Sequence, residues 1–159
     1  MKTAVIYYSL EGNTRYLAEK IASAKGADLI ELVPVETYPD KGFKKFLWGG
    51  KAAVMKDQPQ LEPYSFDAGL YDTVVLCSPV WAGTMAPPLR TFLNTHNLSD
   101  KKIAIAATSA GGNAVKCIKQ LFELSKSSSL ITELSIIDPK SKPSDNKNAA
   151  IDDFINSIN

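Results

Sequence analysis

Hydrophobic runs and helical patterns alternate along the chain. Five short apolar runs have the length and the β-branched content of strands. They span Thr3–Tyr8, Asp28–Val33, Thr73–Cys77, Lys102–Ala107 and Leu130–Ile137. The first, third and fourth runs are almost continuously apolar, as expected for strands covered on both faces. The pattern predicts an α/β fold whose parallel sheet has helices on each side.

The stretches between these runs carry helical periodicity. Leu17, Ile21 and Ala24 fall on one face of a helix predicted over Asn13–Ala24. Further helices are predicted over Pro88–Leu93, Ala114–Leu124 and Ala149–Ile158. Because 159 residues suffice for one ordinary domain but not for two, we expect a single domain over 1–159.

The connection from about Pro34 to Asp72 is unusually long for this kind of fold. It holds Gly42–Val54, predicted as a helix, and a proline-rich return over Gln58–Tyr64. Four apolar side chains of the helix belong either to the core, which we favour, or to a cover over a bound molecule: Phe43, Phe46, Leu47 and Trp48. Five lysines cluster in the same segment, most simply as a solvated helix face: Lys41, Lys44, Lys45, Lys51 and Lys56.

Composition narrows the class of function. The chain is 45% hydrophobic and 22% charged, which is typical of a soluble globular protein. Its formal net charge of +1 gives no extended field of one sign, which argues against nucleic acid or a membrane surface as the partner. We find neither a secretory leader nor a run long enough to span a bilayer, and therefore expect a cytoplasmic protein.

The chain has few cysteine and histidine residues that could form a metal site or a redox dithiol. Cys77 and Cys117 lie far apart without a C-x-x-C pair, and His96 is the one histidine. We predict two ordinary buried or half-buried thiols and no metal site.

Three of the predicted strands are followed by unusual loops at the edge of the sheet where open α/β folds bind ligands. Ser9–Thr14 leads into a helix whose free N–H groups favour a phosphate, although an ordinary N-cap would also explain it. Ser78–Pro88 contains Trp81, a flat apolar surface suited to a planar heteroaromatic ligand. Thr108–Asn113 contains paired glycines, which let the backbone approach a ring edge closely.

These loops do not match the motifs of other nucleotide-binding or phosphate-binding folds. The first strand is not followed by G-x-G-x-x-G, and Gly50-Lys51 precedes Ala52 rather than the Ser or Thr of a P-loop. A phosphoacceptor receiver domain would need an aspartate where the third strand here ends in CSPVW. All three classes are therefore disfavoured.

Over its whole length the chain resembles the flavodoxin family. The first loop is similar to the family's S/T-x-T-G-x-T phosphate loop, with Ser9, Gly12 and Thr14 in register. The segment SPVWAGTMAPPLRTFL is close to the form seen in flavodoxins and related NAD(P)H-dependent oxidoreductases. The resemblance implies a five-stranded parallel sheet in the order 2-1-3-4-5, with FMN at its switch point. It implies no catalytic residue, because the flavin carries the redox chemistry.

The resemblance also implies which residues hold the cofactor. The phosphate would be held by Ser9, Leu10, Glu11, Gly12, Asn13 and Thr14. The isoalloxazine would be contacted by Pro79, Val80, Trp81, Ala82 and Gly83, and its pyrimidine side by Ser109, Ala110, Gly111 and Gly112. Glu11 departs from the family's usual threonine, and its carboxylate would repel a phosphate unless the side chain turned outward.

We therefore expect a flavodoxin-type carrier that exchanges electrons with redox partner proteins. The alternative is an NAD(P)H-dependent FMN or quinone reductase, and the near-neutral charge weakens the carrier interpretation because the family's carriers are typically acidic. The segment Gly42–Met55 discriminates between them: packing on the sheet edge favours the carrier, whereas shielding of the ring favours the reductase. A monomer or a weak homodimer is compatible with either.

Overall fold

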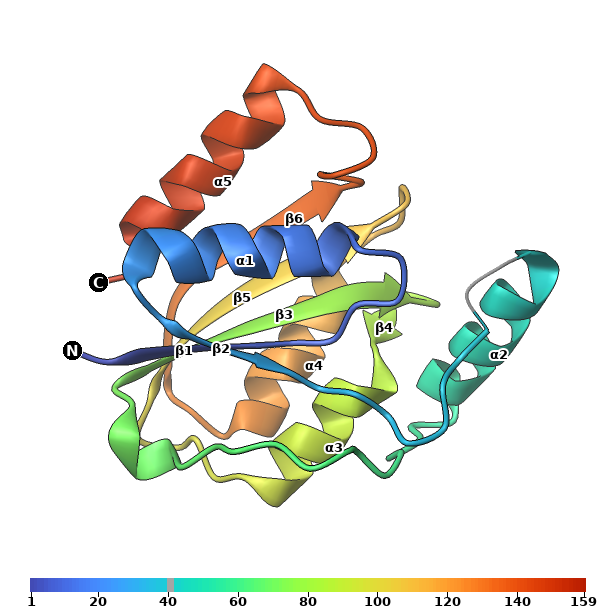
Figure 1. The fold of residues 1–159 in the computed structure, drawn as a ribbon, viewed down its shortest axis with the longest axis horizontal. Coiled ribbons are helices and arrows are strands. Elements are labelled where there is room, and N and C mark those ends of the chain that lie inside the picture. The colour runs from blue at the N-terminus through green and yellow to red at the C-terminus, as the bar shows by residue number, and fades with distance from the viewer. Residues whose placement is uncertain (40–41) are drawn as a thin grey trace.

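Five parallel strands form the centre of the computed structural model, which describes residues 1–39 and 42–159 and, for 42–47, the backbone alone. The strands lie in the order β2-β1-β3-β5-β6, which is the topology implied by the resemblance (Figure 1). Their bounds are β1 Thr3–Tyr7, β2 Asp28–Glu31, β3 Thr73–Trp81, β5 Lys102–Ser109 and β6 Ser129–Ile137. A short strand absent from the predicted pattern, β4 (Thr84–Met85), pairs antiparallel with β3.

Two helical layers cover the sheet, one on each face (Figure 1), and alternate side chains of the central strands pack against them. Val5 and Val75 pack with the layer formed by α1 (Asn13–Lys25) and α5 (Asp145–Ser157). Their neighbours along the strands, Ile6 and Leu76, pack with the opposite layer. That layer consists of α3 (Pro87–Thr95) and α4 (Val115–Ser125). Because all four strand side chains are fully buried, the sheet is covered on both faces, as the apolar runs predict.

The C-terminal helix begins at Asp145 rather than at Ala149, where the apolar pattern starts. Ser144 caps it, because the Ser144 Oγ accepts a hydrogen bond from the Lys147 N–H at 3.3 Å. The first turn is polar and exposed, so hydrophobic periodicity could not reveal it.

The long connection contains α2 (Gly42–Val54) and an extended return, as predicted. The return pairs with the chain beyond β2 through Val35 N–H to Gln60 O at 2.9 Å and Glu62 N–H to Val33 O at 2.7 Å. It is tied to α3 by the Thr91 hydroxyl, which donates to Pro59 O at 2.8 Å. A short 3-10 helix, Ala68–Leu70, then leads into β3.

Both cysteines are buried free thiols, as predicted. Burial raises the pKa of Cys77 and that of Cys117 to about 12, so both remain protonated and unreactive. Separately, none of the described helices combines the length and apolar character needed to cross a bilayer.

An aromatic cluster holds the return segment against α3. The Tyr64 hydroxyl and His96 Nε2 are hydrogen-bonded at 2.8 Å, and the His96 ring lies 4.7 Å from Phe92 and 5.0 Å from Phe66 between centroids. Burial lowers the pKa of His96 because the imidazolium would lose its hydration among these rings.

We expect this cluster to make the fold sensitive to mild acid. Since the pKa of His96 is lower in the folded chain than in the unfolded one, the unfolded chain binds the proton more readily. The free energy of unfolding should therefore fall as the pH decreases below about 6.5. Urea unfolding between about pH 7.5 and 5.5 would measure this, with His96→Gln as the control. Equal pH slopes for the two proteins would show that His96 is not responsible.

Candidate functional site

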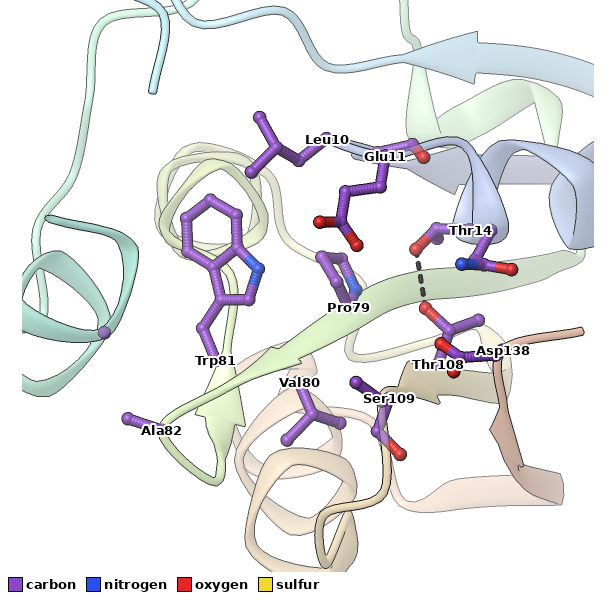
Figure 2. Close-up of a pocket in the computed structure, with 14 residues that line it drawn as sticks. Leu10, Glu11, Thr14, Pro79, Val80, Trp81, Ala82, Thr108, Ser109 and Asp138 are labelled. Atoms are coloured by element: carbon purple, nitrogen blue, oxygen red, sulfur yellow. Dashed lines mark hydrogen bonds between the residues drawn. The ribbon is translucent and has the colours of Figure 1, made fainter. Parts of the chain in front are cut away.

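A pocket of about 300 Å³ opens at the carboxyl ends of β1, β3 and β5 (Figure 2). It brings together eleven residues of the three predicted loops: Ser9, Leu10, Glu11, Asn13, Thr14, Pro79, Val80, Trp81, Ala82, Ser109 and Ala110. Four predicted residues do not line it: Gly12, Gly83, Gly111 and Gly112. Three residues to which the sequence assigned no cofactor contact also line it: Gly50, Asp138, and Thr108, which begins the third predicted loop.

The loop between β1 and α1 presents free backbone donors. Gly12, at φ 102°, precedes the helix, and its N–H donates to Ser9 Oγ at 3.1 Å. No described side chain caps α1, and its first internal hydrogen bond runs from the Tyr16 N–H to Gly12 O at 3.0 Å. The N–H groups of residues 13–15 are thus available at the positive end of the helix dipole, where an anion binds favourably.

A buried pair of hydroxyls links this loop to β5. Thr14 Oγ1 and Thr108 Oγ1 are 2.7 Å apart, and both residues are almost fully buried (Figure 2). One hydroxyl donates to the other, so one hydroxyl hydrogen of the pair remains for a ligand. The pair also fixes the start of α1 against the end of β5.

An aromatic wall is built around Trp81. Its ring meets Tyr8 edge-on at 5.4 Å and 88°, and Tyr38 at 5.1 Å and 82°. Gly49 packs on the same ring, since a Cβ there would lie 3.2 Å from Trp81 Cε3. Burial raises the pKa of both tyrosines, to about 12 for Tyr38, so their hydroxyls stay neutral. The aromatic wall is therefore uncharged, and its indole is contacted by Tyr8, Tyr38 and Gly49.

Trp81 lies on a strand, whereas the sequence suggests a loop from Ser78 onward. β3 continues to Trp81 because a two-residue turn, Ala82–Gly83, leads back into β4, with both residues at positive φ (50° and 77°). Ser78 Oγ accepts from the Ala86 N–H at 3.0 Å. These bonds hold the indole more rigidly than a loop would.

The segment Gly42–Met55 lies near the ends of β3 and β4 and not on the sheet edge (Figure 1), and its Gly50 lines the pocket. The glycine pair of α2 makes the contact, because Gly49 meets Trp81 and Gly50 lines the pocket. Trp48 is 53% exposed, so the expectation that it belongs to the core is wrong. Six other positions singled out above lie outside the described residues or side chains: Lys41, Phe43, Lys44, Lys45, Phe46 and Leu47.

The loop after β6 supplies a fourth wall. Asp138, at φ 42°, lines the pocket and donates its N–H to Ser109 O at 2.9 Å, while its carboxylate pairs with Lys142 at 3.0 Å. Asp138 could have been predicted from the sequence, because the end of the last parallel strand lies at the same edge as the other loops.

Gly112, one of the four predicted residues that do not line the pocket, borders a second hollow between α4 and β6.

Two polar residues of the pocket lining differ in where their side chains lie. The Ser109 Oγ is buried and has no hydrogen-bond partner among the described residues. The Glu11 side chain points into the pocket rather than outward (Figure 2). A molecule bound in the pocket therefore meets the Glu11 carboxylate and the donors of α1, whereas the Ser109 Oγ is shielded from it by the protein.

Comparison with known proteins agrees with this geometry. The family model described as Flavodoxin matches residues 2–145. A Bacteroides eggerthii protein superposes with a TM-score of 0.74 at 23% identity, over 99% of this chain and 97% of that one. A Lactobacillus acidophilus flavoprotein, solved in complex with FMN, gives 0.70 at 29% identity, over 88% and 95%. A Bacillus anthracis azoreductase gives 0.56 at 16% identity, over 98% of each chain. The matches to the Bacteroides eggerthii and Bacillus anthracis proteins, both below 25% identity, show a shared fold alone.

The hydroxyl pair predicts a measurable coupling between α1 and β5. Thr14→Val and Thr108→Val should each lower the free energy of unfolding by about 1 kcal/mol, because each leaves a buried hydroxyl without its partner. The double variant should lose less than the sum of the two. Urea unfolding of the four proteins measures the coupling, and strictly additive losses would argue against it.

Proposed function

The chain belongs to the flavodoxin family, and on this premise we propose that it holds one FMN noncovalently in the pocket and transfers electrons through it. The observation that carries the proposal is the division of the pocket into two chemically different ends. Free amides and hydroxyls gather at the start of α1, and an aromatic wall stands at the end of β3.

The α1 end fits a phosphate. It offers the amides of residues 13–15 together with the hydroxyls of Ser9 and Thr14, whose oxygens already accept or share one hydrogen bond each. The Ser9 hydroxyl can still donate, and the Thr14 hydroxyl can donate when it accepts from Thr108. A phosphate accepts from several donors at once. Asn13 lines the pocket, but its side chain is used elsewhere, since Asn13 Oδ1 accepts from the Lys140 N–H at 2.9 Å.

The β3 end fits a planar, mostly apolar ring. Pro79, Val80 and Trp81 supply flat and apolar surface. On the β5 side, Ser109 and Ala110 line the pocket. The residues of both ends therefore match the two halves of FMN, except for Glu11, whose carboxylate points into the pocket and has to turn away from a bound phosphate.

In this proposal the protein binds and orients the cofactor, and bound FMN supplies the redox chemistry. Trp81 and Val80 would shield the ring from water, and the α1 amides would hold the phosphate. The Glu11 carboxylate adds negative charge inside the pocket, which disfavours further negative charge there. We name no residue of this chain as a proton donor or acceptor.

Electron transfer between proteins is our first candidate, and direct reduction by NAD(P)H is the second. The position of α2 favours the second candidate, because Gly50 lines the pocket and α2 is not packed on the sheet edge. Trp48 supports the first candidate, since this exposed aromatic side chain is not among the described residues that line the pocket. An experiment on the loaded protein decides between them.

We expect Trp81 to contribute to flavin binding and Trp48 to contribute nothing. Trp81→Leu should weaken FMN binding by about tenfold through the lost aromatic contact, whereas the matched variant Trp48→Leu should bind normally. Titrating apoprotein with FMN and following the quenching of flavin fluorescence measures both affinities. In Trp48→Leu, FMN should also quench the remaining indole. Equal affinities for the two variants would remove Trp81 from the site.

The choice between carrier and reductase rests on one titration. Protein loaded with FMN and freed of excess flavin is titrated without oxygen, first with NADPH and then with NADH. A carrier keeps its visible flavin band with both nucleotides and loses it only with dithionite. Prompt bleaching by either nucleotide would overturn the carrier and establish a reductase. A chain that retains no flavin would overturn the cofactor assignment itself.

A further inference from the structure

A lysine from the loop after β6 lies over the phosphate loop. The Lys140 Nζ is 3.3 Å from the position that a Cβ at Gly12 would take, and its Cδ is 3.8 Å from the same point. The ammonium group therefore rests on the bare backbone of Gly12, one residue before α1. A larger residue at this position would meet the lysine, so the close approach depends on glycine.

The placement of this lysine is built into the backbone. Asn13 Oδ1 accepts hydrogen bonds from the N–H groups of Lys140 at 2.9 Å and Ser141 at 3.3 Å. The side chain at the first position of α1 thus ties the loop after β6 to the phosphate loop. This contact joins positions far apart in the sequence.

The arrangement brings like charges together. The amino end of α1 carries a partial positive charge, and the Lys140 ammonium sits beside it. Among the described residues no carboxylate forms an ion pair with Lys140, whereas the neighbouring Lys142 pairs with Asp138 at 3.0 Å. Two positive groups held at one point attract an anion more strongly than either does alone.

We infer that Lys140 binds the phosphate of FMN and makes the site prefer FMN over uncharged riboflavin. This inference rests on the proposed function, and it concerns a residue outside the three loops named by sequence analysis. Riboflavin has the same ring but no phosphate, so it keeps every contact at the β3 end and loses those at the α1 end. The preference between the two flavins therefore isolates the contribution of the anion end.

The test compares Lys140→Met with Lys102→Met as apoproteins. Both variants remove one positive charge, but Lys102 lies at the start of β5, at the end of the sheet opposite to the pocket. FMN and riboflavin affinities are measured by fluorescence quenching at about 0.01 M and about 0.15 M ionic strength. A third variant, Lys140→Arg, keeps the charge.

We expect Lys140→Met to weaken FMN binding by about tenfold at low ionic strength, the loss expected for one charge-assisted hydrogen bond. Its riboflavin affinity should be unchanged, and its FMN affinity should depend less on salt. Lys102→Met and Lys140→Arg should bind both flavins within about twofold of the parent chain.

Three outcomes would overturn the inference. In the first, Lys140→Met binds FMN as tightly as Lys102→Met does. In the second, it loses FMN and riboflavin affinity equally, which indicates damage to the fold or the ring site. In both of these cases the parent chain still binds FMN, so the proposed function stands. In the third, the parent chain binds neither flavin, and the proposed function fails together with the inference.

Discussion

The parallel pairing of β3 with both β1 and β5 is the constraint on which the rest of the structure depends. Ile6 is opposite Leu76 and Leu76 is opposite Ile105, and all three side chains are fully buried. Because the strands are parallel and in this register, their carboxyl ends come to one edge of the sheet. The loops that follow β1, β3 and β5 therefore meet there, although they are widely separated in the sequence.

The same edge also concentrates the irregular geometry of the molecule. Gly12, Ala82 and Asp138 all have positive φ, and each belongs to a segment next to the pocket. The two non-glycine residues among them are held by pairing on both sides of the turn or by a backbone bond to β5. Well-packed strands can support such backbone conformations, which are unfavourable in free energy. At this edge they direct amides, hydroxyls and the indole toward the pocket.

Charge in the site is balanced locally rather than by the molecule as a whole. The formal net charge of +1 says little, because Glu11 and Asp138 bring carboxylates to the pocket while Lys140 and Lys142 approach the same loops. A binding site for an anionic cofactor thus arises in a nearly neutral protein. The local arrangement matters most here, since exposed charges separated by more than about 8 Å are largely screened at physiological ionic strength.

The sequence by itself determined the alternation of strands and helices, the apolar central strands, the buried thiols and most of the pocket lining, because period and turn chemistry are local properties. It did not reveal β4, the polar first turn of α5 or the exposure of Trp48. Only the tertiary structure brought Thr108 to Thr14, Gly49 to Trp81 and Lys140 to Gly12. Those contacts depend on strand register and on the packing of distant loops, which no local pattern encodes.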